Sequence, residues 1–369
     1  MVKKAKVVVA MSGGVDSSLT AALLVQQGYD VIGVTMRLAD ESRDFDPLDD
    51  RGCCTLKSVD DARRVADTIG IPHYVMNFRD MFQEKVIDYF IDEYARGHTP
   101  NPCIACNRYV KFEGLLQRSL ALDAEFLATG HYARIEQDSK TGRYLLCKGM
   151  DTHKDQSYAL YHLNQSSLKH FMLPLGGYTK VETRRLAAEL NLSVADKPDS
   201  QEICFIPNDD YKSYLKEKVP KAIKPGNIID INGNILGRHQ GVPFYTIGQR
   251  KGLGIAAKAP LYVVDLNLKK NVVIVGEAKD VFAPALIAKD LNWISIDGIT
   301  EPLTVKAKVR YGPKESSATV IPIAEDVVKV VFDQPQRAVT PGQSIVFYDG
   351  DCVVGGGVIV RSLRNKDEV

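Results

Sequence analysis

Residues 7–24 read VVVAMSGGVDSSLTAALL, and this stretch decides the fold of the first half of the chain. An apolar run typical of a buried strand leads into Ser12, Gly13 and Gly14, and a helix-like pattern of leucines and alanines follows. A strand, a glycine-rich turn and a helix in that order place backbone N–H groups and a helix N-terminus where an anion can bind. The turn is therefore predicted to hold phosphate.

The turn lacks the lysine of the Walker phosphate-binding loop. That loop ends in Gly-Lys-Ser/Thr so that its lysine reaches the terminal phosphates of a nucleotide, whereas Val15 and Asp16 stand at the equivalent place here. The difference favours a loop that cradles a leaving pyrophosphate, with Asp16 free to help hold a magnesium ion. A tight glycine-rich turn without any ligand is the alternative.

The residues after the turn continue the alternation of strands and helices to about residue 205. Strands are predicted at 6–11, 31–36, 72–78 and 125–130, and helices at 17–27, 58–69, 86–95 and 180–190. This alternation is typical of a doubly wound parallel sheet. Thr179 with Glu182 predicts a capping box for the last of these helices, and Ser58 with Asp61 predicts a weaker one for the second.

The second half of the chain changes to short strands and turns. Asn232-Gly233 is a strong hairpin signal, and strand alternation recurs in TVKAKVRY, VVKVVF and SIVFYDGDCVVGGGVIV. We therefore expect an α/β protein with a doubly wound parallel-sheet domain at residues 1–208, a small central domain at 209–280 and a C-terminal β-barrel at 281–369.

Composition and charge limit the class of protein. The 369 residues are 45% hydrophobic and 25% charged, which is ordinary for a globular protein of two or three domains. No apolar segment approaches the ~18 residues of a membrane span, and polar residues follow the N-terminus too soon for a signal peptide, so we expect a cytoplasmic protein. The net charge of +1 gives no global nucleic-acid footprint, so any polyanion site must be local.

Three cysteines lie in polar surroundings. Cys103 and Cys106 form a Cys-x-x-Cys pair in GHTPNPCIACNRYVKF, and Cys204 lies in DKPDSQEICFI. The two sulfurs of such a pair are within reach of each other or of one metal ion. A structural zinc site would need a fourth ligand, for which His98 is the available candidate.

The other four cysteines are expected to be structural. An odd total of seven cysteines favours reduced thiols over a disulfide scaffold. Cys147 and Cys352 lie in strand-like sequence among apolar neighbours, where they are predicted to pack as small buried thiols. Cys53 and Cys54 are adjacent, which suits neither a single metal ion nor an unstrained disulfide.

The ordered motifs carry a resemblance to a known family. SGGVDSS is the pattern of the ATP-pyrophosphatase (PP-loop) enzymes, and alone it leaves argininosuccinate, GMP, NAD and asparagine synthetases open. Together with TPNPCIACNRYVKF, LATGHYAR, KDQSY, DSQEICFI, YTIGQRKGLG and VRYG, the chain resembles the tRNA-specific 2-thiouridylases end to end. The resemblance implies a PP-loop domain, a small central domain and a β-barrel, and an enzyme that replaces the C2 oxygen of the wobble uridine in certain tRNAs with sulfur.

The resemblance also implies how ATP is used. The C2 oxygen of a uracil is a very poor leaving group, so ATP adenylates it, and AMP and pyrophosphate are formed. The ATP contacts implied are Ala10, Met11, Ser12, Gly13, Gly14, Val15, Asp16, Ser17, Met36 and Gly130. Gly130 suits a close backbone approach, although a simple turn glycine explains it equally well.

For sulfur delivery, the resemblance implies that Cys204 accepts a persulfide from an upstream sulfur-donor protein and that Cys106 is the nucleophile. Cys106 would release the terminal sulfur and form a disulfide with Cys204, which an external reductant must open. Arg108 and Lys111 are near enough in sequence to favour a thiolate, or they form a solvated basic face.

Cys103 departs from the family pattern. Many relatives carry aspartate at this position as the candidate acid or base near the target uridine, so Cys103 cannot be assumed to do that work. Cys103, Cys106 and Cys204 also form a possible three-thiolate pocket for an iron–sulfur cluster with one open iron. A persulfide relay and a cluster therefore both remain open.

The resemblance implies tRNA contacts at three places. They are Asn101, Pro102 and Cys103 beside the target base, Lys154, Asp155 and Gln156, and Arg310 and Tyr311. The lysine-rich stretch YKSYLKEKVPKAIK either meets phosphates or is merely solvated. A PP-loop ligase for a small molecule and a non-catalytic, metal-stabilised RNA-binding protein are the alternatives, and pyrophosphate release that depends on tRNA would exclude both.

Overall fold

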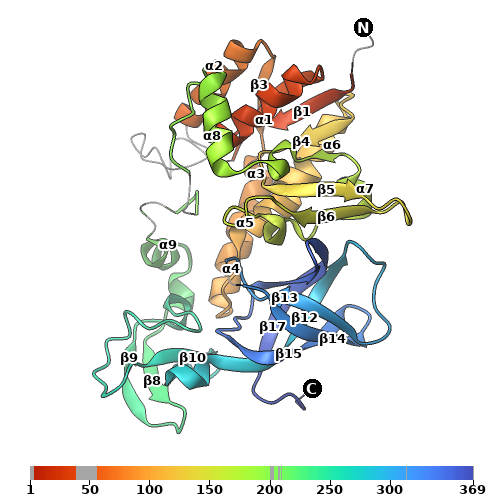
Figure 1. Ribbon diagram of the computed structural model, residues 1–369. Coiled ribbons are helices and arrows are strands. Elements are labelled where there is room, and N and C mark those ends of the chain that lie inside the picture. The colour runs from red at the N-terminus through yellow and green to blue at the C-terminus, as the bar shows by residue number, and fades with distance from the viewer. Residues whose placement is uncertain are drawn as a thin grey trace. The chain divides into compact units, whose positions relative to one another are not determined.

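A computed structural model describes residues 4–38, 56–199, 203–206, 208, 210–312 and 314–368 of the protein (Figure 1). The chain forms two compact units. The first comprises residues 1–87, 102–209 and 351–353, and the second comprises residues 88–101, 210–350 and 354–369.

The first unit is built on a five-stranded parallel sheet. Its strands are β1 (Lys6–Ala10), β2 (Asp30–Arg37), β3 (His73–Asn77), β4 (Phe126–Ala128) and β7 (Phe171–Met172), in the order β3-β2-β1-β4-β7. Ala10 is paired with Val34, and Val9 with Ala128, so the carboxyl ends of the three central strands meet at one edge. The predicted parallel-sheet α/β fold is confirmed.

The central strand and the helix after it form the core of this unit. Val7, Val8 and Val9 are fully buried, as expected for a strand covered on both faces. The main helices are α1 (Val15–Gln26), α2 (Leu56–Ile69) and α8 (Lys180–Glu189). The β1–α1 loop, residues 10–17, is thereby placed at the carboxyl edge of the sheet, where open parallel sheets bind ligands.

Shorter elements complete the first unit. They are α3 (Arg79–Phe82), η1 (Gln83–Asp88), α5 (Pro102–Ala105), η2 (Cys106–Leu115), α6 (Leu116–Leu120), β5 (Ala133–Gln137), β6 (Tyr144–Lys148), η3 (Ser157–Leu160), α7 (Gln165–Leu168) and η4 (Pro174–Gly177). Helix α4 (Tyr89–Ala95) follows η1 in the chain and belongs to the second unit.

Only one of the two predicted capping boxes is present. The Thr179 side chain accepts from the Glu182 N–H, and the Glu182 carboxylate accepts from the Thr179 N–H at 2.7 Å. The capping box predicted at Ser58 and Asp61 is wrong, because α2 begins at Leu56 and Ser58 lies inside the helix.

A small sheet forms the first part of the second unit. It contains β8 (Gly226–Asp230), β9 (Ile235–His239), β10 (Tyr262–Asn267) and β11 (Val272–Gly276), in the order β10-β11-β8-β9. Helix α9 (Tyr211–Lys218) and the turns η6 (Pro220–Ala222), η7 (Val242–Phe244) and η8 (Ala278–Val281) accompany it. The predicted hairpin is confirmed: Gly233 has φ +90°, and the Asp230 carboxylate accepts from the backbone N–H groups of Asn232 and Asn234.

A closed β-barrel forms the rest of the second unit. Its strands are β12 (Phe282–Trp293), β13 (Leu303–Lys308), β14 (Ser316–Ala324), β15 (Val327–Arg337), β16 (Ser344–Asp349) and β17 (Cys352–Leu363). They follow the order β12-β15-β14-β13-β16-β17, and β12 also pairs with β17, which closes the barrel as predicted. Fully buried Phe332 and Phe347 help fill its interior. In the part of the chain described, no helix has the length and apolar character needed to cross a membrane.

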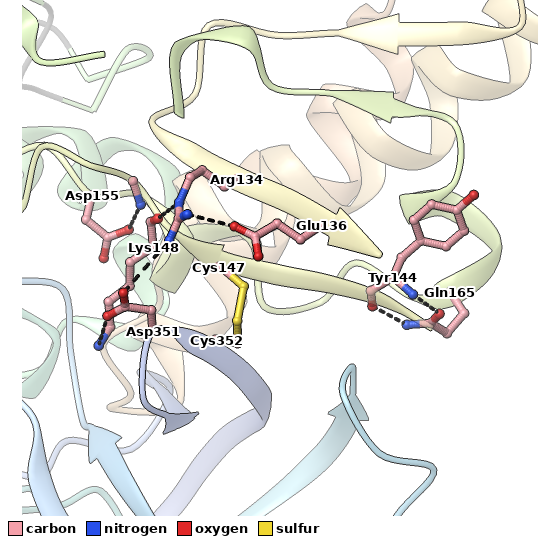
Figure 2. The surroundings of a disulfide bond; sticks show 10 residues. Arg134, Glu136, Tyr144, Cys147, Lys148, Asp155, Gln165, Asp351 and Cys352 are labelled. Atoms are coloured by element: carbon pink, nitrogen blue, oxygen red, sulfur yellow. Dashed lines mark hydrogen bonds and ion pairs between the residues drawn. A yellow bond between two sulfur atoms is a disulfide. The ribbon is translucent and has the colours of Figure 1, made fainter. Parts of the chain in front are cut away.

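Cys147 and Cys352 form a disulfide in the first unit (Figure 2). The prediction that both are free buried thiols is therefore wrong. The physical reason is the pairing of β6 with the start of β17: the two cysteines are opposite each other, with their Cα atoms 4.0 Å apart. Beside them the Lys148 N–H donates to the Asp351 carbonyl at 2.8 Å, and the Asp351 carboxylate faces Arg134 at 3.8 Å.

Candidate active site

The β1–α1 loop has a geometry that requires glycine at Gly13. Its φ is +70°, and a Cβ there would lie 2.2 Å from the Ser58 carbonyl oxygen of α2. The Ser12 N–H donates to the Ser17 hydroxyl at 3.1 Å, and that hydroxyl donates to the Gly14 carbonyl at 3.2 Å. The loop is thus held in a compact form against the neighbouring helix.

Met36 and Gly130, the two predicted ATP contacts outside the loop, lie near the same edge of the sheet. Met36 is the second-last residue of β2, and Gly130 follows β4 by two residues. A Cβ on Gly130 would lie 2.8 Å from the Asp16 carbonyl carbon and from the Ser17 nitrogen, and its φ is outside the left-handed region. Glycine is therefore required here for close approach to the loop, rather than for a turn.

The Asp16 carboxylate is occupied by other side chains of the protein. Lys180 Nζ lies 2.7 Å from Oδ1 and 2.8 Å from Oδ2, and the Tyr132 hydroxyl donates to Oδ1 at 2.7 Å. This arrangement does not fit the predicted magnesium ligand, because a lysine already neutralises the carboxylate. Burial and the neighbouring Asp16 charge both raise the pKa of Tyr132, so its hydroxyl keeps its proton.

Lys180 also belongs to a second ion-pair cluster, centred on Asp199. Asp199 Oδ1 lies 2.7 Å from Lys180 Nζ and 2.9 Å from Arg184 Nη2, while Oδ2 lies 2.7 Å from Lys154 Nζ. Although burial raises the pKa of Asp199, the hydrogen bonds from Lys154 and Lys180 lower it to about 2. Asp199 is therefore ionised at neutral pH.

A further lysine reaches the loop from the residues after α8. Lys197 Nζ donates to the Gly13 carbonyl at 3.2 Å and pairs with Asp61 Oδ2 on α2 at 2.7 Å. The β1–α1 loop contains no lysine in its own sequence. Lys180 and Lys197, which lie far from it in the chain, both contact it.

The predicted tRNA segment 154–156 is joined to this network. Lys154 pairs with Asp199, and the Asp155 carboxylate accepts from the N–H groups of Gly149 and Ser157. Gln156 and Tyr132 are linked twice, since the Tyr132 N–H donates to Gln156 Oε1 and the Gln156 N–H donates to the Tyr132 carbonyl, both at 2.9 Å.

The three cysteines of the predicted sulfur chemistry are all in the first unit and all are thiols. Cys103 is exposed on α5, Cys106 is buried at the start of η2, and Cys204 is partly exposed. Lys111, one of the two residues predicted to favour a thiolate, donates to Asn107 Oδ1 at 2.9 Å. The guanidinium of the other, Arg108, lies 5.1 Å from the ring centre of Tyr109.

The metal alternatives do not fit the arrangement of these side chains. Among the residues described, no group of three or more His, Cys, Asp and Glu side chains could hold a metal ion. Cys103, Cys106 and Cys204 therefore do not form a ready ligand set for an iron–sulfur cluster. His98, the proposed fourth zinc ligand, belongs to the second unit, where its Nδ1 lies 2.8 Å from Glu93 Oε2.

Two histidines near η2 were not predicted as site residues. The rings of His131 and His162 both lie 5.9 Å from the ring of Phe112. Burial, and then the charge of Arg108, lower the pKa of His162 to about 3, and both of its ring nitrogens lack a hydrogen-bond partner. Burial also lowers the pKa of His131 well below its ordinary value, so both rings are neutral at neutral pH.

Some predicted residues lie elsewhere or outside the described part of the chain. Asn101, Arg310 and Tyr311 belong to the second unit, and Tyr311 is 51% exposed. Pro102 is buried at the start of α5 in the first unit. Cys53 and Cys54 lie outside the described residues.

Sequence reasoning missed the ion-pair network around the loop. Tyr132 and Asp199 do lie in motifs used for the family resemblance, LATGHYAR and KPDSQEICFI, but nothing in those motifs indicates an ion pair with Asp16. Lys180 lies in none of the quoted motifs. Its only signal is its position directly after the Thr179 cap, which fixes where α8 begins.

Comparison with known proteins covers nearly the whole chain. Family models match residues 5–208 (tRNA methyl transferase HUP domain), 212–277 (tRNA methyl transferase PRC-barrel domain) and 284–359 (aminomethyltransferase beta-barrel domain). The tRNA-specific 2-thiouridylase MnmA of Carboxydothermus hydrogenoformans is 55% identical over 363 residues, 98% of this chain and 100% of that protein. The protein of the same name from Clostridioides difficile is 55% identical over 359 residues, 97% of this chain and 99% of that protein.

Proposed function

Because this chain belongs to the family of tRNA-specific 2-thiouridylases, we propose that it replaces the C2 oxygen of the wobble uridine in certain tRNAs with sulfur. The observation that carries the proposal is similarity along almost the full length of the relatives, including every domain. The β1–α1 loop supplies the chemical support, since adenylation of a carbonyl oxygen needs a nucleotide held by its phosphates at the edge of the sheet.

ATP is cleaved between its α- and β-phosphates. The uridine C2 oxygen attacks the α-phosphate, and pyrophosphate leaves toward the loop formed by Ser12, Gly13 and Gly14. Met36 and Gly130 frame the adenosine. Because Gly130 has no side chain, its backbone can lie close to the loop backbone at Asp16 and Ser17. The products of this step are adenylated tRNA and pyrophosphate, and AMP leaves in the next step.

Sulfur reaches the activated carbon through two cysteines. An upstream sulfur-donor protein leaves a persulfide on Cys204. The Cys106 thiolate attacks Cys204 Sγ, so the persulfide S–S bond breaks, a Cys106–Cys204 bond forms and the terminal sulfur leaves as hydrosulfide. Hydrosulfide then attacks C2 and AMP departs, and an external dithiol supplies two electrons to reopen the disulfide. Both cysteines are thiols before this cycle begins.

tRNA needs a local cationic surface, and residues 211–264 have the required charge. Nine lysines and arginines stand there against two carboxylates, a formal charge of +7 in a chain whose total is +1. Eight of the nine cations are exposed. The ninth, Lys212, lies beside Gly252: its Nζ is 3.9 Å from the point where a Cβ on that glycine would lie. Arg250 and Lys251 precede that glycine, so helix α9 and this loop offer cations side by side to RNA phosphates.

The test quantifies four compounds in one reaction. Purified protein is incubated with ATP and a persulfide donor, with and without tRNA, and AMP, ADP, pyrophosphate and 2-thiouridine are quantified. We expect pyrophosphate and AMP, no ADP, and 2-thiouridine only when tRNA is present. Pyrophosphate release driven by a small amino or carboxylate substrate instead would support a PP-loop ligase, and no release at all would support a non-catalytic RNA-binding protein.

A further inference from the structure

The β1–α1 loop carries no lysine of its own, but a lysine from a distant part of the chain contacts it. Lys180, the first residue of α8, lies 164 positions after Asp16 in sequence and contacts both oxygens of its carboxylate. Its side chain is only 11% exposed, so the ammonium group is held in place by the surrounding protein.

The three donors of the Lys180 ammonium group are all engaged, but two of them are redundant. Two go to the two oxygens of Asp16, at 2.7 and 2.8 Å, and one goes to Asp199 Oδ1 at 2.7 Å. One Asp16 contact can be exchanged while the other still maintains the ion pair. The Tyr132 hydroxyl also donates to Asp16 Oδ1, so that oxygen stays hydrogen-bonded after the exchange.

The charges around Lys180 balance when no ligand is bound. Lys154, Lys180 and Arg184 contribute three positive charges. Asp16, Asp199 and Asp151, whose carboxylate accepts from the Lys180 N–H at 2.9 Å, contribute three negative ones. A phosphate that binds at the loop brings its own negative charge into this partly buried environment, where charge interactions are strong. Lys180 is the cation of the cluster that contacts the loop, so its ammonium group is the one placed to meet that charge.

We propose that Lys180 supplies the phosphate-binding cation that the loop lacks. When a nucleotide binds, one Lys180 donor moves from Asp16 to an oxygen of the β- or γ-phosphate and stabilises the pyrophosphate as it leaves. Asp16, Tyr132 and Asp199 are positioning residues, because they aim the ammonium group. Lys197 has a different part, since it pairs with Asp61 and holds the Gly13 carbonyl, which shapes the loop.

The proposal rests on the use of ATP in the proposed function, and it is tested without tRNA. Binding of pyrophosphate and of adenosine is measured separately by calorimetry for the wild type, Lys180→Met and Arg185→Met. Arg185 is the control because it lies on the same helix but is exposed and pairs with Glu189 at 2.6 Å. We expect Lys180→Met to weaken pyrophosphate binding by about tenfold or more and to leave adenosine binding unchanged.

A double variant separates phosphate binding from charge balance. Lys180→Met leaves Asp16 unpaired, so Asp16→Asn is made alone and together with Lys180→Met, and folding is followed by circular dichroism. If Lys180 binds phosphate, the double variant binds pyrophosphate about tenfold more weakly than Asp16→Asn. If Lys180 only neutralises Asp16, the two variants bind pyrophosphate equally, and the proposal is wrong.

This test is independent of the thiolation reaction. Loss of pyrophosphate binding in Lys180→Met with no 2-thiouridine formed by the wild type would support the role of Lys180 and contradict the proposed function. Unchanged pyrophosphate binding in a variant of an active wild type would contradict only the role of Lys180.

Discussion

Reduction of the Cys147–Cys352 disulfide is expected to destabilise the protein strongly. The bond joins residues 205 positions apart, so it restricts a very long loop in the unfolded chain. Closing a loop of that length stabilises the folded state by about 5 kcal/mol at 25 °C in the chain-entropy model. The bond also ties residues 351–353 to the strand β6, which supplies the partner cysteine (Figure 2).

The assay compares urea unfolding of the oxidised protein, the reduced protein and Cys147→Ala/Cys352→Ala. The reduced protein and the double variant should unfold at similar urea concentrations, both well below that of the oxidised protein. Cys103→Ala, which removes an exposed thiol, is the control and should leave the unfolding midpoint unchanged. A cross-linked peptide containing both cysteines should be found by mass spectrometry before reduction. If that peptide is found and reduction does not move the midpoint, the loop-closure reasoning is refuted.

Three further predictions concern the loop, the buried histidine and the departure at Cys103. Gly13→Ala should abolish ATP binding measured by calorimetry while the protein stays folded, because the new Cβ would meet the Ser58 carbonyl oxygen at 2.2 Å; retained affinity would contradict the close packing. His162 stays neutral in the folded protein down to about pH 3, so it should contribute a loss of stability of up to about 2 kcal/mol as the pH drops from 7 to 5. His162→Phe should reduce the pH dependence of urea unfolding by that amount, while buried His131 keeps its own share of it; an unchanged pH dependence would contradict the neutral state of His162. Cys103→Asp restores the residue of many relatives and should keep 2-thiouridine formation without changing iron content; a loss of iron and activity together would favour a cluster.

Much of the fold could be predicted because its signals are local. The run Val7–Val9, the glycines after it and the helical pattern that follows are adjacent in sequence, and each constrains the next through backbone geometry. Thr179 and Glu182 form their capping box for the same reason, since the interaction spans only three residues. Ser58 shows the limit of such a signal, because the same residue types also occur inside a helix that begins earlier.

The contacts between distant segments could not be predicted. Cys147 and Cys352 looked like ordinary buried thiols, because strand composition does not say which strands pair. The ion pair between Lys180 and Asp16 is a contact of the same kind: Asp16 was predicted to help hold magnesium, and nothing in the sequence indicates that the start of a helix 164 residues later places a lysine against it. The sequence therefore predicts the glycine-rich loop at the edge of the sheet but not the charges that surround it, and the roles of the three cysteines stay predictions.

The double link between Tyr132 and Gln156 has a consequence for how the two substrates bind. Tyr132 holds the Asp16 carboxylate of the predicted ATP loop, and Gln156 belongs to the predicted tRNA segment. A ligand that moves one of these two residues also strains the hydrogen bonds to the other, so we expect binding at the two predicted sites to be coupled. Such coupling is reciprocal: the factor by which tRNA changes the dissociation constant of ATP must equal the factor by which ATP changes that of tRNA.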